Sequence, residues 1–210
     1  MKRHFKLLKA DKNFISVINE NNVLIFMIFS FLLGFLISVL TFKLKNTNGN
    51  FYAPEFKEYI SAYSGKWLKI LTSAALQILP FAAVVFISGT SMIGSVITPL
   101  ITALRGAELG FIMSYLYVHF SLNGIIFNLL ILIPSAVLTS FALVLSGREA
   151  FGFSLSLARL AVPDAKSVTL DKDFKIYCMR QLFIMLLYIA GLLLQVIMSL
   201  SFFSFFQFKI

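Results

Sequence analysis

The sequence predicts an all-α, polytopic transmembrane helical bundle with about five spans and a cytoplasmic amino terminus. Hydrophobic residues make up 59 % of the 210 residues, and the mean hydropathy is +0.90. Soluble domains are about half apolar, so this composition indicates a protein that lies in lipid. The apolar residues gather in uncharged runs of about 20 residues, the length that a helix needs to cross a bilayer core of about 30 Å.

The charge distribution supports this class and orients the chain. The formal net charge is +9, but the basic residues lie at the ends of the apolar runs and form no stripe with aromatic residues, which excludes a nucleic-acid partner. They are typical of topology signals and of contacts with membrane lipids. Most of the Lys and Arg residues outside the spans precede the first span or lie within 147–180, which favours the cytoplasm for both segments.

The first elements are a basic cytoplasmic segment, 1–22, and a span near 23–42. This apolar run is too long for a signal peptide and lacks a small-x-small cleavage site, so we expect it to remain as an anchor. An outer polar loop, 43–69, follows. It contains apolar residues at helical spacing, which are Phe56, Ile60, Tyr63 and Trp67. This stripe is typical of an interfacial helix among the head groups, and the alternative is a docking face for a partner protein.

The remaining spans are expected near 70–88, 94–119, 124–145 and 181–203. Gly89 and Gly94 bound a tight link between the second and third spans, and Asn123 with Gly124 interrupts the next apolar run. Polarity returns in 147–180, which we interpret as a cytoplasmic loop containing a short interfacial helix. If 94–119 were re-entrant, this basic loop would lie outside the cell, so five spans are preferred over four.

Two charged residues, Arg105 and Glu108, lie in the middle of the third span. A charge at the bilayer centre costs about 3 kcal/mol on insertion scales, so both side chains should face protein or water. Their i, i+3 spacing allows them to pair along their own helix. One interpretation of this intramembrane polar pair is a functional polar site inside the bundle. The other is a self-neutralised pair that fixes helix packing or marks a bend between two half-helices.

The opposite face of the same span is lined by small residues. Gly106, Gly110 and Ser114 lie on it, and the two glycines have the G-x-x-x-G spacing that lets two helix backbones approach closely in lipid. These three residues are therefore predicted to pack against another helix.

Intramembrane enzymes require an activated nucleophile or an activated water molecule. The sequence contains two histidines, one cysteine, no H-E-x-x-H motif and no P-loop. We therefore expect no enzyme activity, no catalytic residues, no cofactor and no metal site. A membrane subunit of a transporter or permease complex that uses the Arg105 and Glu108 face stays open, because carriers place such residues near the bilayer midplane.

Three motifs resemble the stage II sporulation protein M family of integral membrane proteins. They are LRGAELGF at 104–111, LNGIIF at 122–127 and LIPSAVL at 132–138. The sequence departs from the family at Ser135 and Ala136, where many relatives carry a histidine or a polar residue with an asparagine. The resemblance implies a multi-pass protein of a bacterial cell membrane. It also implies a scaffold that localises peptidoglycan-remodelling enzymes at the septal membrane during sporulation engulfment. The partners expected are other membrane or wall-associated proteins, with wall hydrolases among them by resemblance, and a homo-oligomer is left open.

Overall fold

The structure is a computed structural model that describes the backbone of residues 2–45, 66–160 and 170–202. Side chains are described for 22–44, 66–158 and 173–202. Within these ranges the chain is helical and has no strand. The elements are α1 (Lys2–Lys45), α3 (Trp67–Gly89), α4 (Gly94–Phe127), the π-helical turn η2 (Asn128–Leu132), α5 (Ile133–Leu160) and α6 (Leu170–Phe202).

Four helical stretches of the described chain are long and apolar enough to cross a membrane. They are Asn22–Leu44, Trp67–Gly89, Gly94–Ala158 and Asp173–Phe202. The prediction of an all-α fold is therefore confirmed for the described residues, and the length and composition of these stretches are consistent with a helical membrane bundle.

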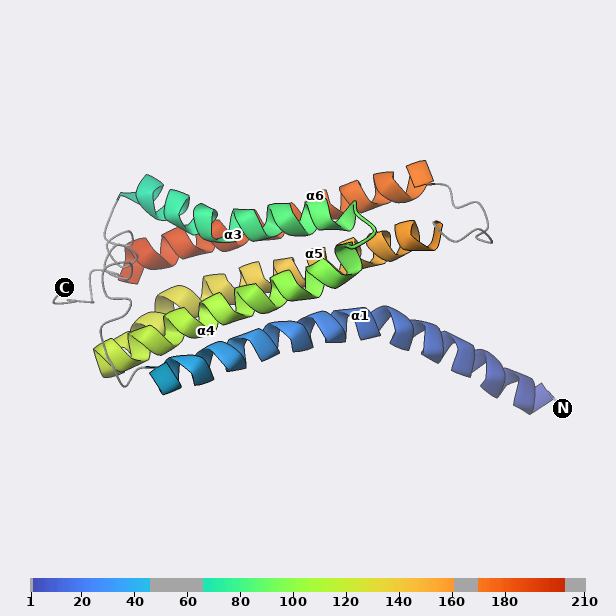
Figure 1. Ribbon diagram of the computed structural model, residues 1–210, viewed down its shortest axis with the longest axis horizontal. Coiled ribbons are helices and arrows are strands. Elements are labelled where there is room, and N and C mark those ends of the chain that lie inside the picture. The colour runs from blue at the N-terminus through green and yellow to red at the C-terminus, as the bar shows by residue number, and fades with distance from the viewer. Residues whose placement is uncertain (1, 46–65, 161–169, 203–210) are drawn as a thin grey trace.

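The longest of these stretches reverses direction at Ser121. The backbone there has φ 48° and ψ −124°. On either side of it the chain packs against itself, because the Asn128 side chain donates to the Met113 carbonyl at 3.4 Å. At the far end the Ser95 backbone N–H donates to the Ser154 hydroxyl at 2.8 Å. The stretch therefore forms a hairpin in which α4 and α5 run antiparallel (Figure 1).

The reversal comes two residues earlier than the Asn123–Gly124 break that the sequence indicates. Gly124 nevertheless has a clear role, because a Cβ atom at this position would collide with the Leu116 carbonyl. Glycine is thus required by a close backbone approach just after the turn, whereas the unusual dihedral angles fall on Ser121.

We expect Ser121→Gly to stabilise the protein by about 1 kcal/mol. The φ and ψ of Ser121 resemble the first central position of a type II′ turn, which glycine adopts without strain. Thermal unfolding in detergent would measure the gain. Ser156→Gly, in the α-helical part of α5, is the matched control and should cost stability, because glycine in a helix interior is unfavourable. If the Ser121→Gly variant loses as much stability as this control, the backbone at Ser121 is not strained.

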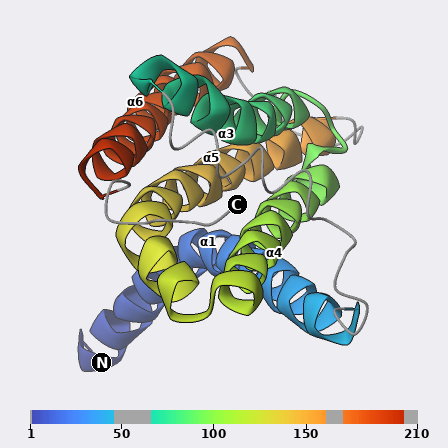
Figure 2. The same cartoon turned by 90° about the vertical axis from the view of Figure 1, so that its left-hand side faces the viewer.

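The α4–α5 hairpin forms the middle of the bundle. Helix α1 packs on one side of it, mainly against α4, and α3 and α6 pack on the other side (Figures 1 and 2). Helix α1 runs parallel to α4, because Met27 contacts Thr102 and Phe31 lies against Gly106 four residues further along both helices. Helix α6 runs antiparallel to α5, since Gln181 pairs with Ser146 and Gly191 lies against Thr139.

The contact between α1 and α4 is a seam of glycines. A Cβ atom at Gly34 would collide with the Ala103 carbonyl, and one at Gly106 would collide with the Phe31 carbonyl. A Cβ atom at Gly110 would lie 2.7 Å from the carbonyl oxygen of Phe35. Without side chains at these points the two backbones come into direct contact, the geometry that small residues permit in lipid.

The predicted boundaries around 147–180 differ from the structure. Helix α5 does not end at residue 145 but continues to Leu160, and α6 begins at Leu170. Gly147 lies inside α5, where its missing side chain admits the methyl groups of Thr98 and Thr102. The segment expected as a separate interfacial helix is therefore the end of α5, and it is buried at Phe153.

The other predicted loops are also shorter in the structure. Helix α1 includes most of the segment expected as a separate basic amino-terminal region, and it extends to Lys45. Helix α3 begins at Trp67, before the expected start of the second span. Residues 46–65 lie outside the described residues, and with them Phe56, Ile60 and Tyr63 of the predicted partner face. Trp67, the fourth member of that face, is 54 % exposed.

Candidate functional site

Arg105 lies at the centre of the bundle, where α4 faces α3 and α6. Its side chain is 5 % exposed and forms an ion pair with Glu108, whose side chain is 29 % exposed, with Nη1 and Oε2 at 2.6 Å. The guanidinium carbon lies 5.8 Å from the centre of the Phe81 ring of α3. A buried cation needs such partners, because an unpaired charge in this environment would be costly. Helix α4 thus directs its charges to one side and its glycines to the other.

The predicted packing residues lie on the α1 side. Gly106 and Gly110 form the seam with α1. Ser114 is half-buried, and its hydroxyl donates to the Gly110 carbonyl at 2.7 Å within the same helix. Because this hydrogen bond stays within α4, the Ser114 hydroxyl needs no partner on another helix, and Ser114 contributes only a small side chain to the surface of α4.

Three buried polar atoms, one each on α4, α5 and α6, have no hydrogen-bond partner among the described residues. They are Nε of Arg105, the hydroxyl of Ser140 and the hydroxyl of Tyr188. The Tyr188 hydroxyl lies near the Ser146 side chain as well as Arg105. Ser140 is seven residues before Gly147, two helical turns away, so it lies on the same α4-facing side of α5. We call Arg105, Glu108, Ser140 and Tyr188 the polar centre.

The polar centre has unused hydrogen-bonding capacity. A buried donor or acceptor without a partner costs about 1–3 kcal/mol, and proteins commonly satisfy such groups with internal water. Arg105 Nε can only donate, whereas the two hydroxyls can donate or accept. This arrangement suits a water molecule or a small acceptor group more than a cation.

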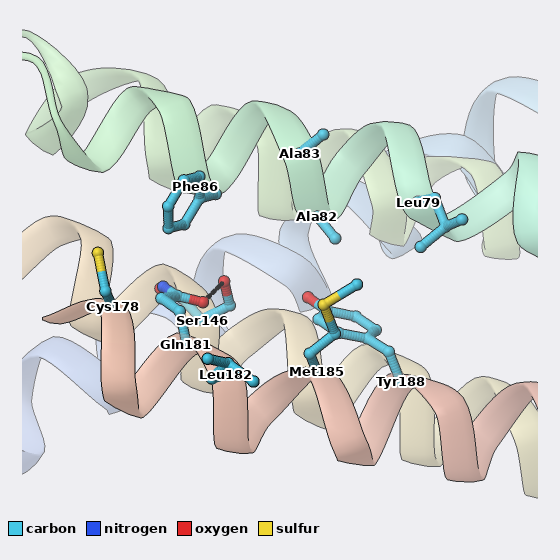
Figure 3. Close-up of a pocket in the computed structure, with 10 residues that line it drawn as sticks. All are labelled: Leu79, Ala82, Ala83, Phe86, Ser146, Cys178, Gln181, Leu182, Met185 and Tyr188. Atoms are coloured by element: carbon cyan, nitrogen blue, oxygen red, sulfur yellow. Dashed lines mark hydrogen bonds between the residues drawn. The ribbon is translucent and has the colours of Figure 1, made fainter.

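A cavity of about 440 Å³ lies between α3 and α6 (Figure 3). Figure 3 shows Leu79, Ala82 and Phe86 of α3 pointing toward α6. The cavity is also lined by Ala83, Ser146, Cys178, Gln181, Leu182, Met185 and Tyr188. Apart from Ser146, Gln181 and the hydroxyl of Tyr188, these side chains are hydrophobic or weakly polar, so the cavity is suited to an apolar ligand.

The polar residues in the cavity wall are held by contacts between helices. The Ser146 hydroxyl donates to Gln181 Oε1 at 2.8 Å, and Gln181 Nε2 donates to the Ser146 carbonyl at 3.0 Å. This reciprocal pair links α5 to α6. Nearby, the Tyr177 hydroxyl donates to the Phe86 carbonyl at 2.9 Å and links α6 to α3.

Sequence reasoning missed this cavity because it did not pair α3 with α6. Two signals for it were present in the sequence. Ala82 and Ala83 are a small pair inside an apolar helix, and Gln181 is a polar residue at the edge of another. Small residues and a polar residue on different spans are the features that bring helices together in lipid, but they do not identify their partner.

No metal centre is formed by the described residues, because they contain no cluster of three or more His, Cys, Asp and Glu side chains. Comparisons with models of known protein families, with curated proteins and with solved structures give no match. The resemblance to the stage II sporulation protein M family therefore stays a prediction from the three motifs.

Proposed function

We propose that the protein is a multi-pass scaffold of a bacterial cell membrane that crosses the bilayer five times, with its amino terminus in the cytoplasm. The helix directions support this topology, because α1, α4 and α6 run one way and α3 and α5 run the other. The α3–α4 link, the end of α5 and the start of α6 then share the cytoplasmic side. Arg148, Lys175, Arg180 and the five basic residues of 2–12 lie on this side, and Lys43, Lys45, Lys66 and Lys69 lie on the other, so the excess of basic residues favours this side as the cytoplasmic one.

In this proposal the protein is not an enzyme, and it holds peptidoglycan-remodelling enzymes at the septal membrane during sporulation engulfment. The observation that supports a scaffold role is that the charge of Arg105 is satisfied by its own neighbours in the bundle. Arg105 is neutralised by Glu108 within the same helix and covered by Phe81, so its charge stabilises the bundle interior. The identity of the partners rests on the motif resemblance alone.

The face that would receive partners lies on the outer side, next to the start of α3. Trp67 is exposed there, and large aromatic side chains often anchor protein interfaces. Affinity capture of the tagged protein from membranes in mild detergent tests the proposal. We expect wall hydrolases with the unaltered protein and their loss with the Tyr63→Ala/Trp67→Ala variant.

The control for this experiment is Leu76→Ala, which removes another exposed apolar side chain of α3 that lies away from the outer end. Both variants should reach the membrane at unchanged abundance, but only the double variant should lose the hydrolases. Capture of an ATPase or a permease that both variants retain would overturn the scaffold role.

A second candidate function, a membrane subunit of a transporter, is favoured by one observation. Arg105 Nε, Ser140 and Tyr188 have hydrogen-bonding capacity that the described residues do not use. A transport subunit would lose substrate flux in Glu108→Gln without a change in abundance. A scaffold would show only the effects of this substitution on folding, and partner capture would follow the amount of folded protein.

A further inference from the structure

The cavity between α3 and α6 opens on the exposed outer surface of the bundle. Leu182 is 68 % exposed and Met185 is 51 % exposed, and both lie on the rim formed by α6. The cavity lies between two stretches that are long and apolar enough to cross a membrane. Water is a poor occupant because few polar groups line the cavity, and an empty space would forfeit the dispersion contacts of its walls. An apolar occupant from the bilayer fits both conditions.

The size and lining of the cavity suit a hydrocarbon chain. Ten residues of α6 separate Cys178 from Tyr188, which corresponds to about 15 Å along the helix. The volume of about 440 Å³ lies within the usual range of small-ligand pockets, about 300–1,000 Å³. An extended hydrocarbon chain can follow this length between α3 and α6.

The end of the cavity near Cys178 has more basic than acidic residues, because Arg148, Lys175 and Arg180 outnumber Glu149 and Asp173. Lys175, Cys178, Leu182 and Met185 are separated by three, four and three residues, so they lie on one face of α6. Lys175 is exposed one turn beyond the cavity. Arg180, also near this end, is exposed and forms an ion pair with Glu149 at 2.7 Å. Lysine and arginine side chains near a membrane surface attract anionic head groups.

We propose that this cavity binds one acyl chain of an anionic phospholipid, whose head group lies beside Lys175. The assignment to the cytoplasmic leaflet rests on the orientation proposed above, whereas binding itself does not depend on it. The chain would contact Phe86, Ala82 and Met185, which point into the space between α3 and α6 (Figure 3). The bound lipid would then connect these two helices at their lipid-facing edge.

Native mass spectrometry of the purified chain, titrated with phosphatidylglycerol or phosphatidylcholine, tests the proposal. We expect one tightly retained phosphatidylglycerol per chain. Leu182→Trp places a bulky ring at the mouth of the cavity and should weaken retention at least tenfold. Leu186→Trp is the matched control, because Leu186 is similarly exposed on α6 but does not line the cavity. Equal retention by the two variants would overturn the site.

Two further variants refine the test. One separates an effect on lipid binding from an effect on folding, and the other separates binding of the acyl chain from recognition of the head group. Ala82→Leu fills the cavity from α3 and should also lose the lipid, so the test does not depend on the folding of Leu182→Trp. Lys175→Gln should keep an acyl chain but lower the preference for phosphatidylglycerol over phosphatidylcholine about fivefold. An unchanged preference would overturn the head-group assignment.

Cys178 provides a second readout because it is the only cysteine of the chain and lines the cavity. Its alkylation by a maleimide should slow severalfold when phosphatidylglycerol is added to the unaltered protein, and should not respond in Leu182→Trp. A rate independent of lipid would overturn the proposal. So would a thiol that is protected in native membranes but reacts fully in phosphatidylglycerol micelles, because a protein would then cover the cavity. The partner-capture experiment probes the opposite end of α3, so the two proposals can fail separately.

Discussion

Replacing Glu108 by alanine is expected to lower the free energy of unfolding by about 3 kcal/mol. The substitution leaves the Arg105 guanidinium buried without its carboxylate partner, and breaking a buried ion pair in this way typically costs about 3–5 kcal/mol. We expect the lower end of this range, because the Glu108 side chain keeps 29 % exposure. Thermal unfolding and the monodisperse fraction in detergent would measure the loss.

The chain offers two informative comparisons for this prediction. Arg180 and Glu149 form an ion pair of similar length, 2.7 Å, but the Arg180 side chain is 61 % exposed. Exposed pairs contribute about 0–1 kcal/mol, so Glu149→Ala should have a small effect. The double variant Arg105→Met/Glu108→Leu removes both charges and should recover most of the lost stability. Equal losses in Glu108→Ala and Glu149→Ala would show that burial of Arg105 is not what makes its pair important.

Replacing Gly106 by leucine is expected to separate α1 from α4. A Cβ atom at Gly106 would collide with the Phe31 carbonyl, so α1 cannot stay in its position when any side chain is added. Overpacking of a well-packed contact costs about 1–3 kcal/mol, and we expect the upper end because the clash is with backbone. A Met27→Cys/Thr102→Cys pair in a Cys178→Ser background would report the contact by disulfide formation.

Gly152→Leu is the matched control, because nothing lies within 4 Å of a Cβ atom at this position. Cross-linking between residues 27 and 102 should persist in this variant and fall sharply in Gly106→Leu. Efficient cross-linking in both would mean that the glycine seam does not hold α1 in place.

The sequence by itself determined the features that depend on local spacing. Uncharged runs long enough to cross a bilayer predict helices, because backbone groups in lipid must be hydrogen-bonded within their own segment. The proximity of Arg105 to Glu108 and the alignment of Gly106 with Gly110 likewise follow from helical periodicity. Helix ends were less predictable: the return of polar residues at 147 indicates the end of a span, but α5 continues to Leu160, and Gly147 inside it packs against Thr98 and Thr102 of α4.

Only the tertiary structure decided which helix meets which. The sequence does not indicate that Gly34 on α1 is the counterpart of the small residues of α4, that the chain reverses at Ser121, or that α3 and α6 enclose a cavity. The physical reason is that lipid solvates an apolar helix as well as another helix does, so apolar patterning does not select a partner. Selection comes from close backbone approach and from polar groups such as Ser146 and Gln181, which pair only after the helices have assembled.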